Sequence, residues 1–401
     1  MKRTYFWLII IALLLITIGN REYSEVSDRA IVNAVGIDSS EEGITVTLQV
    51  FNSHGSGGDT QIDPSKSNVF VISDTADSFE EALDECESQL GNYLFMGHNQ
   101  VIVLGSGVSF ENPSELLSFF IHNRENYPGV DVVLAENTAK EIMKVQLTKG
   151  AVATENFTEI IKMYRENGEA VYSDMLHLVN ALNGGDRSAV IPLVSVRKNS
   201  TDDHRDGAGE ESESSSQEES SSQSESGSGE KDSKSDGSQG ELIVIDGAAV
   251  IHDGKVKGTI SQREITGLNW MTNKIDHIVV NTEVNGLRTG VTVKNKDTDV
   301  SVLVRENRLV MKTDIKAEIL PENSMSAVLD GDELNKAVER EIKTLCSEAV
   351  EKIYGEYHSD VFNAVGNVKF HYPQVYLDFK DDIEGLKGLI DFEINVVCIA
   401  K

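Results

Sequence analysis

The chain has 401 residues, with 66 acidic against 36 basic side chains and a formal net charge of −30. This length predicts two or three domains, at roughly 100–200 residues per domain. The acidic balance excludes nucleic-acid binding and electrostatic adhesion to anionic lipid, because both need clustered lysine and arginine. Three cysteines (Cys86, Cys346 and Cys398) are too few and too scattered for a disulfide framework or a structural zinc site.

The first residues have the pattern of a targeting segment. Lys2 and Arg3 precede a run from Tyr5 to Ile18 that is apolar except for Thr17. The run is shorter than the about 20 residues that span a bilayer, and it is typical of the apolar region of a signal peptide. We therefore expect residues 1–19 to be cleaved or kept as a short anchor, and the rest to lie outside the cytoplasm.

Residues 20–198 predict a mixed α/β region. Four apolar residues alternate with polar ones from Ile44 to Val50, which predicts a half-buried strand. Denser apolar runs predict two central strands, over residues 30–37 and 69–72. Two further strands are predicted over residues 100–104 and 130–135.

Capping patterns predict where the helices of this region begin. Ser78 with Glu81 precedes a helix that carries Phe79, Leu83, Cys86 and Leu90 on one face. Cys86 is therefore expected to be a core residue rather than a nucleophile. Thr138 with Glu141 begins the next helix, and a third is predicted around Ile160, Ile161 and Met163.

Residues 199–240 are rich in serine and acidic residues and contain almost no apolar side chain. Such a segment cannot bury enough apolar surface to offset its ordering entropy, so we expect a disordered linker. A calcium-binding or partner-binding tract is the alternative, and a solvated tether is the favoured interpretation.

Residues 241–401 predict a second α/β region. Strands over residues 242–251 and 255–260 form a hairpin that turns at Asp253-Gly254, and Ser261 begins a short helix. A strand with one wet face covers residues 311–319, and a closing strand carries residues 394–398.

A long helix is predicted over residues 332–357. Its apolar stripe consists of Leu334, Val338, Ile342, Leu345, Ala349 and Ile353. Two ion pairs one turn apart are expected on its polar side, Glu339 with Lys343 and Glu348 with Lys352. Together the elements predict a multi-domain α+β fold of mixed, mostly antiparallel sheets with packed helices.

No constellation of catalytic residues is visible in the sequence. The patterns HExxH, GxSxG and CxxC do not occur. The glycine-rich stretch from Ser53 to Gly58 predicts a hairpin loop rather than a phosphate cradle. The histidines share no metal-ligand spacing, among them His98, His122, His252, His277 and His358. We therefore predict no catalytic, cofactor-binding or metal-binding residue, no cofactor, and a protein that is not an enzyme.

Several strings in fixed order resemble the Ger(x)C family. Ala30 to Asp38 (AIVNAVGID) resembles its opening strand, and Phe95 to Val103 (FMGHNQVIV) its internal F-x-G-H segment. Asp246 to Val250 (DGAAV) and Glu264 to Trp270 (EITGLNW) are similar to the start of its C-terminal region. Asp360-Val361-Phe362 and Tyr372-Pro373 continue the similarity.

Members of that family are C subunits of the nutrient germinant receptors of spore-forming bacteria. The resemblance implies a non-enzymatic subunit beside two integral-membrane partners, on the extracytoplasmic face of the inner spore membrane. It also implies that a permease-like partner binds the amino acid, sugar or nucleoside germinant. The position of the family's lipidated cysteine falls on Asn20, which cannot carry a thioether-linked lipid, and Arg21 replaces the tryptophan that usually follows.

Two other functions remain open. An extracytoplasmic solute-binding protein would have two lobes joined by a hinge, and the linker over residues 199–240 argues against it, because hinge closure needs short crossings. A secreted hydrolase would have glutamate or aspartate at the rim of a cleft between the domains.

Overall fold

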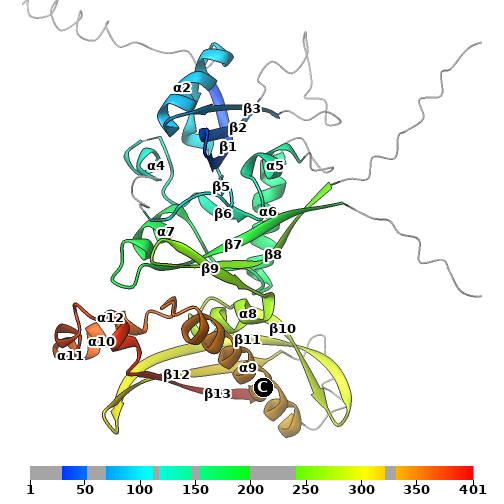
Figure 1. The fold of residues 1–401 in the computed structure, drawn as a ribbon. Helices are drawn as coiled ribbons and strands as arrows, with labels where there is room; N and C mark the ends of the chain where they lie inside the picture. Colours follow the sequence, from blue (N-terminus) through cyan, green and yellow to red (C-terminus); the bar gives the residue numbers. More distant parts are fainter. Residues whose placement is uncertain are drawn as a thin grey trace, which may run out of the picture.

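The computed structural model describes residues 29–51, 69–111, 117–123, 125–145, 153–198, 241–320 and 331–400. The predictions for residues 1–19, Asn20, the loop over residues 53–58 and the linker lie outside these ranges. The described residues form two stacked lobes, each built on one sheet (Figure 1). The first lobe contains the elements up to residue 260, and the second lobe contains those from residue 262 onward.

The first lobe holds a nine-stranded sheet in the order β3-β2-β1-β5-β6-β7-β8-β9, with β4 paired to β1. Its centre is parallel from β1 to β7, and antiparallel pairs extend it on both sides. The strands are β1 (Arg29–Ser40), β2 (Gly43–Phe51), β3 (Val69–Ala76), β4 (Tyr93–Phe95), β5 (Val101–Leu104), β6 (Asp131–Ala135), β7 (Ser188–Lys198), β8 (Glu241–His252) and β9 (Lys255–Ile260).

Helices cover both faces of this sheet, which gives the first lobe two cores. Residues of α2 (Phe79–Leu90), α4 (Ser118–His122) and α7 (Met175–Leu182) pack in one core. Residues of α5 (Ala139–Lys144) and α6 (Ala153–Glu166) pack in the other. A short 3-10 turn, η2 (Met96–His98), follows β4.

The predicted helix starts of this lobe are confirmed. The side chain of Ser78 accepts a hydrogen bond from the backbone N–H of Glu81, and Thr138 does the same for Glu141. Cys86 is fully buried in the core, and burial raises the pKa of its thiol to about 11. This is the environment of a packing residue rather than of a nucleophile.

Two strand predictions need correction. The strand over residues 69–72, expected to be central, belongs to β3 at the edge of the sheet, and Phe70 and Val71 are exposed. The strand from Ile44 to Val50, expected to be half-buried, is covered on both faces over its second half. Thr47 and Gln49 on its polar side are buried because α5 packs there, and Gln49 donates a hydrogen bond to the carbonyl of Met143.

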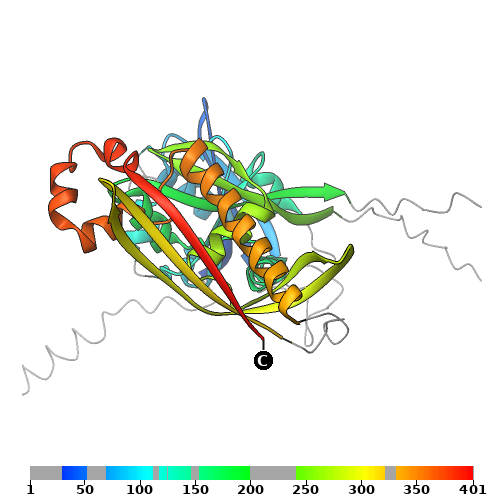
Figure 2. The same ribbon diagram turned by 90° about the horizontal axis from the view of Figure 1, so that it is seen from below.

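The second lobe holds a four-stranded sheet in the order β10-β11-β12-β13. Its strands are β10 (His277–Val284), β11 (Leu287–Arg305), β12 (Arg308–Ile319) and β13 (Ile390–Ala400), and β13 runs parallel to β12. One face packs against α8 (Gln262–Met271) and α9 (Gly331–Ala349), which continues as a π-helix, η5 (Val350–Glu356). Figure 2 shows α9 lying across this sheet. Three short helices complete the lobe, α10 (Ala364–His371), α11 (Pro373–Asp378) and α12 (Ile383–Lys387).

All six residues of the predicted apolar stripe of the long helix are buried. The two ion pairs predicted on its polar side are wrong, because Glu339 and Glu348 have partners from other elements and Lys352 pairs with a residue one turn further along the same helical segment. Arg263 of α8 binds Glu348, and Lys352 binds Glu356. The carboxylate of Glu339 accepts a hydrogen bond from the backbone of Cys398 in β13.

The polar face predicted for β12 is less exposed to solvent than expected. Glu318 on this face is buried and forms an ion pair with Lys296 of β11.

The two lobes are joined at Ser261, between β9 and α8. The segment over residues 199–240 does not connect the lobes, since it lies in the sequence between β7 and β8, which pair with each other in the first sheet. The first two strands of the region over residues 241–401 therefore complete the sheet of the region before it. The predicted fold class is confirmed, with mixed sheets, packed helices and more antiparallel than parallel strand pairs among the described residues.

Gly267 and Gly247 show why glycine stands in two of the family-like strings. At Gly267, where α8 meets the long helix, a Cβ atom would lie 2.0 Å from the carbonyl oxygen of Leu345. Gly247 has a φ of +133° beside a register shift between β7 and β8. Gly267 thus allows close packing of two helices, and Gly247 allows a backbone shape that other residues rarely adopt.

Candidate functional site

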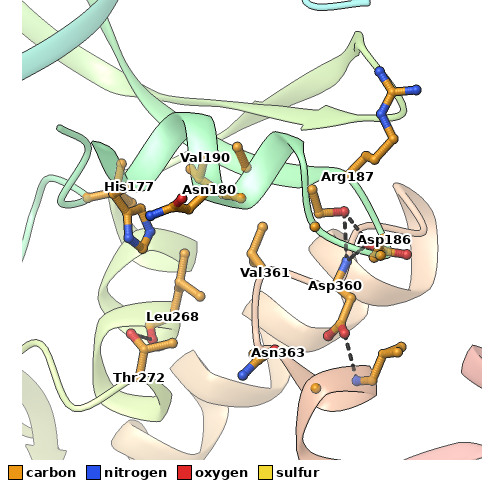
Figure 3. A pocket seen from close by; sticks show the side chains of 18 of the residues that line it. His177, Asn180, Asp186, Arg187, Val190, Leu268, Thr272, Asp360, Val361 and Asn363 are labelled. Atoms are coloured by element: carbon orange, nitrogen blue, oxygen red, sulfur yellow. Dashed lines mark hydrogen bonds between the residues drawn. The ribbon is translucent and has the colours of Figure 1, made fainter. Parts of the chain in front are cut away.

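A cavity of about 520 Å³ lies between the two lobes. The first lobe contributes α7 and the start of β7, and the second lobe contributes α8 and the segment from Asp360 to α10. Figure 3 shows His177 and Asn180 of α7 facing Leu268 and Thr272 of α8, with Val361 and Asn363 closing the space between them. The volume lies within the range of small-molecule pockets.

Side-chain caps position the three helices that form the walls. Asp174 accepts a hydrogen bond from the backbone N–H of His177 at the start of α7. Ser261 and Glu264 form a reciprocal capping box at the start of α8. The buried carboxylate of Asp360 accepts hydrogen bonds of 2.7 Å from the backbone N–H groups of Ala364 and Val365, where α10 begins. The orientation of the lining side chains is therefore set locally, by residues beside the cavity.

A cluster of ionic side chains lies at one end of the cavity and joins the two lobes. The ammonium group of Lys387 is 2.6 Å from a carboxylate oxygen of Asp186 and 2.6 Å from one of Glu384. It also donates a hydrogen bond to the carbonyl oxygen of His358. The side chains of Lys387 and Asp186 are 5% and 9% exposed, so this pair is almost entirely removed from water.

His252, the last residue of β8, lies between the two carboxylates of this cluster. Its Nδ1 is 3.6 Å from Asp186 and its Nε2 is 3.4 Å from Glu384. The hydroxyl of Ser188 contacts both Asp186 and His252. The backbone N–H of Asp360 donates a 2.8 Å hydrogen bond to Asp186, which ties the second lobe to the cluster.

The two buried carboxylates have opposite pKa shifts. Burial acts to raise the pKa of Asp186, but hydrogen bonds from His252, Lys387 and Ser188 outweigh it and hold that pKa below the usual range. Burial raises the pKa of Asp360 to about 7, although two backbone N–H groups favour its charged form. Asp186 is thus the anion of the cluster, and Asp360 titrates near neutrality.

Three of these groups, Asp186, His252 and Glu384, could each offer one atom to a metal ion, since their ligand atoms lie within 4.8 Å of one another. The ammonium group of Lys387 already contacts both carboxylates, and a metal ion there would face a buried positive charge. The arrangement therefore suits an ionic clamp between the lobes better than a metal centre.

Arg187 lies beside the cluster and points away from the cavity in Figure 3. Its guanidinium group binds the carboxylate of Asp253 in the β8–β9 turn and the carbonyl oxygen of Glu111. These contacts hold the segment before β7 against the β8–β9 hairpin. The guanidinium group of Arg187 therefore makes these contacts within the first lobe.

The sequence predicts no site residue, and the structure shows which of the residues considered there lie close together. Of the five histidines considered, His252 is the one that belongs to a group of possible metal ligands within the described ranges. Three of the others lie elsewhere: His98 ends η2, His122 ends α4 and His277 begins β10. His358, which follows η5, contacts the cluster through its backbone carbonyl oxygen. One signal was present, because the strings ending at Trp270 and Phe362 both contribute residues to the cavity wall.

Comparison with known proteins gives a consistent result over both lobes. Residues 22–196 match the family described as the spore germination protein N-terminal domain. Residues 246–397 match the family described as spore germination B3/GerAC like, C-terminal. No curated protein matches the chain.

The fold is also similar to a solved structure, described as the crystal structure of the GerBC protein. The two share 15% sequence identity with a TM-score of 0.52, over 91% of this chain and 96% of that one. At this identity the similarity concerns the fold. Among the helices that the structure describes, none is long and apolar enough to cross a membrane.

Proposed function

This chain belongs to the GerAC-like family of spore germination proteins, and from that membership we propose that it is the C subunit of a nutrient germinant receptor. The observation that carries the proposal is that both family domains match the chain in order, over residues 22–196 and 246–397. The likeness to GerBC in fold supports it.

We infer that the subunit has no catalytic role. The ionisable cluster beside the cavity supports this, because Lys387 neutralises the carboxylates that a hydrolase would need free for acid–base chemistry. The cysteines support it as well, since all three are buried and burial raises the pKa of each thiol.

We also propose that the protein works at the extracytoplasmic face of the inner spore membrane, beside two integral-membrane subunits. The apolar run from Tyr5 to Ile18 supports attachment through the N-terminal segment, and Asn20 argues against a thioether-linked lipid. The strongly acidic composition fits a protein whose folded part stays away from anionic lipid headgroups.

Co-purification from spore membranes tests the assignment. A tagged chain should bring down a permease-like subunit and a second large membrane subunit in constant ratio. Spores of a deletion strain, with redundant receptors also removed, should lose the response to at least one nutrient. Normal germination with every nutrient in that strain would contradict the proposal. Turnover of peptidoglycan or peptides by the purified chain would instead favour a hydrolase.

The mode of attachment has its own test. If the apolar segment is retained, the protein should stay in the membrane fraction after a high-salt wash without incorporating labelled palmitate. Incorporation of label would refute the argument from Asn20. Release by salt alone would refute a retained anchor.

A further inference from the structure

The cavity between the lobes is lined in part by exposed polar side chains, and the ring of one of them, His177, also contacts the ring of Tyr172. His177 and Asn180 of α7 and Asn363 before α10 face the cavity in Figure 3. Among the described residues, none of these three side chains has a hydrogen-bond partner. Such groups, converging from two lobes on one space, are typical of a ligand site.

The cavity also has an excess of positive charge, although the chain as a whole carries −30. Lys274 and Lys369 both line it. Their ammonium groups lie over the rings of Tyr172 and Tyr376, at 5.5 and 5.0 Å from the ring centroids. Neither lysine has a carboxylate partner within the described part of the chain.

The carboxylates of the cavity wall do not balance these lysines. Asp186 is neutralised by Lys387 in the clamp, and the oxygens of Asp360 accept two backbone N–H groups. Arg187 is bound to Asp253 and Glu111. An anion entering the cavity would therefore find two cations that are free to bind it.

Apolar side chains form another part of the wall. Val190 of β7, Leu268 of α8 and Val361 lie between the polar groups in Figure 3. Contact with these side chains would remove the apolar body of a ligand from water, which favours binding.

We propose that this cavity binds a small organic anion with an apolar body, such as a short branched carboxylate. The anionic group is held by Lys274 or Lys369 together with the amides of Asn180 and Asn363, and the body contacts Val190, Leu268 and Val361. The ligand touches both lobes, so its binding stabilises their present arrangement.

Calorimetric titration of the full chain, purified in mild detergent, tests the proposal. The probe is 4-methylpentanoate, and 4-methylpentanamide is the neutral molecule of the same shape. We expect the carboxylate to bind at least tenfold more tightly than the amide. Equal binding of the two, or no binding of the carboxylate at millimolar concentration, would overturn the proposal.

Variants locate the site. The double variant Lys274→Gln, Lys369→Gln should bind the carboxylate at least tenfold more weakly, and its affinity for the amide should be unchanged. Lys257→Gln, an exposed lysine of β9 outside the cavity, is the matched control and should change nothing. An effect of the control equal to that of the cavity lysines would show that only surface charge is being measured, and would overturn the site.

Val361→Trp should fill the cavity and abolish binding. Its thermal unfolding is measured alongside, because an overfilled junction can fail to fold. If the variant fails to fold, saturation-transfer NMR on the unaltered chain takes its place. Transfer of saturation to the ligand from the methyl groups of Val190, Leu268 and Val361 would support the site, and transfer from other methyl groups alone would overturn the site. Binding is measured on the isolated chain, so its failure is distinct from a failure to co-purify with membrane subunits.

Discussion

The two sheets of the molecule bury their faces differently. In the first sheet, neighbouring residues of β1 belong to different cores, Ala34 to one and Val35 to the other, and both are buried. In the second sheet, Met311 and Ile315 of β12 face the helices, while Lys312 and Lys316 on the other face are partly exposed. The centre of the first sheet is therefore lined by apolar side chains on both faces, whereas the open face of the second sheet carries a row of ion pairs.

The largest effect is expected where the lobes meet. Lys387→Met removes the only lysine that contacts the buried carboxylate of Asp186 among the described residues, and should lower the free energy of unfolding by about 3–5 kcal/mol. Lys312→Met removes the partner of Asp314 on the partly exposed face of the second sheet, and should cost less than about 1 kcal/mol. Urea unfolding of both variants measures the difference. Equal losses would mean that the cluster at the junction is not an ionic clamp.

A pair of truncations tests the comparison of the sheets directly. Ile102 of β5 is fully buried, and Ile102→Ala should cost about 2–5 kcal/mol through lost burial and the cavity left behind. Val397 of β13 is 55% exposed on the open face, and Val397→Ala should change stability by no more than about 0.5 kcal/mol. Chemical denaturation curves give both values. A large loss at Val397 would show that something covers this face.

The stability of the protein should be next most sensitive to substitutions where α8 crosses the long helix. Gly267→Ala places a Cβ atom against the carbonyl of Leu345, and should cost about 1–3 kcal/mol by forcing the helices apart. Gly331→Ala at the start of α9 has open space around the added carbon and should be neutral or slightly stabilising. Thermal unfolding compares them, and an unchanged melting temperature for Gly267→Ala would refute the close approach.

The last expected effect is a change in the pH dependence of stability, which is small within any one pH unit. Burial raises the pKa of Asp360 to about 7, so the folded state holds its proton more tightly than the unfolded state does. The stability that this proton contributes is complete below pH 3.8 and is lost as the pH rises to about 7. Asp186, with a lowered pKa, acts in the opposite direction and only below its ordinary range.

Asp360→Asn removes this titration. Between pH 5 and 7, the stability of the unaltered chain should fall relative to the variant, by at most about 1.4 kcal/mol per pH unit. Melting temperatures measured across this range check the slope. Parallel curves for the two proteins would show that Asp360 is already ionised at pH 5.

Local patterns in the sequence were enough to place most elements. The caps at Ser78 and Thr138 were predicted because a cap and its partner lie within one turn of the chain. The strand over residues 69–72 was placed wrongly within the sheet, because its apolar composition is the same whether a neighbour lies on one side or on both. The ion pairs of the long helix were also wrong, because the partners of Glu339 and Glu348 come from other elements.

By itself, the sequence determined many of the helices and strands, the fold class and the family, since these depend on periodicity, capping and ordered strings within short stretches of chain. Tertiary structure alone decided that residues 241–260 complete the first sheet, and that Asp186, His252 and Lys387 meet between the lobes. The reason is physical: these groups come from separate elements, and no local pattern fixes a contact between them. The ionic clamp and the cavity beside it exist only once both lobes are in place.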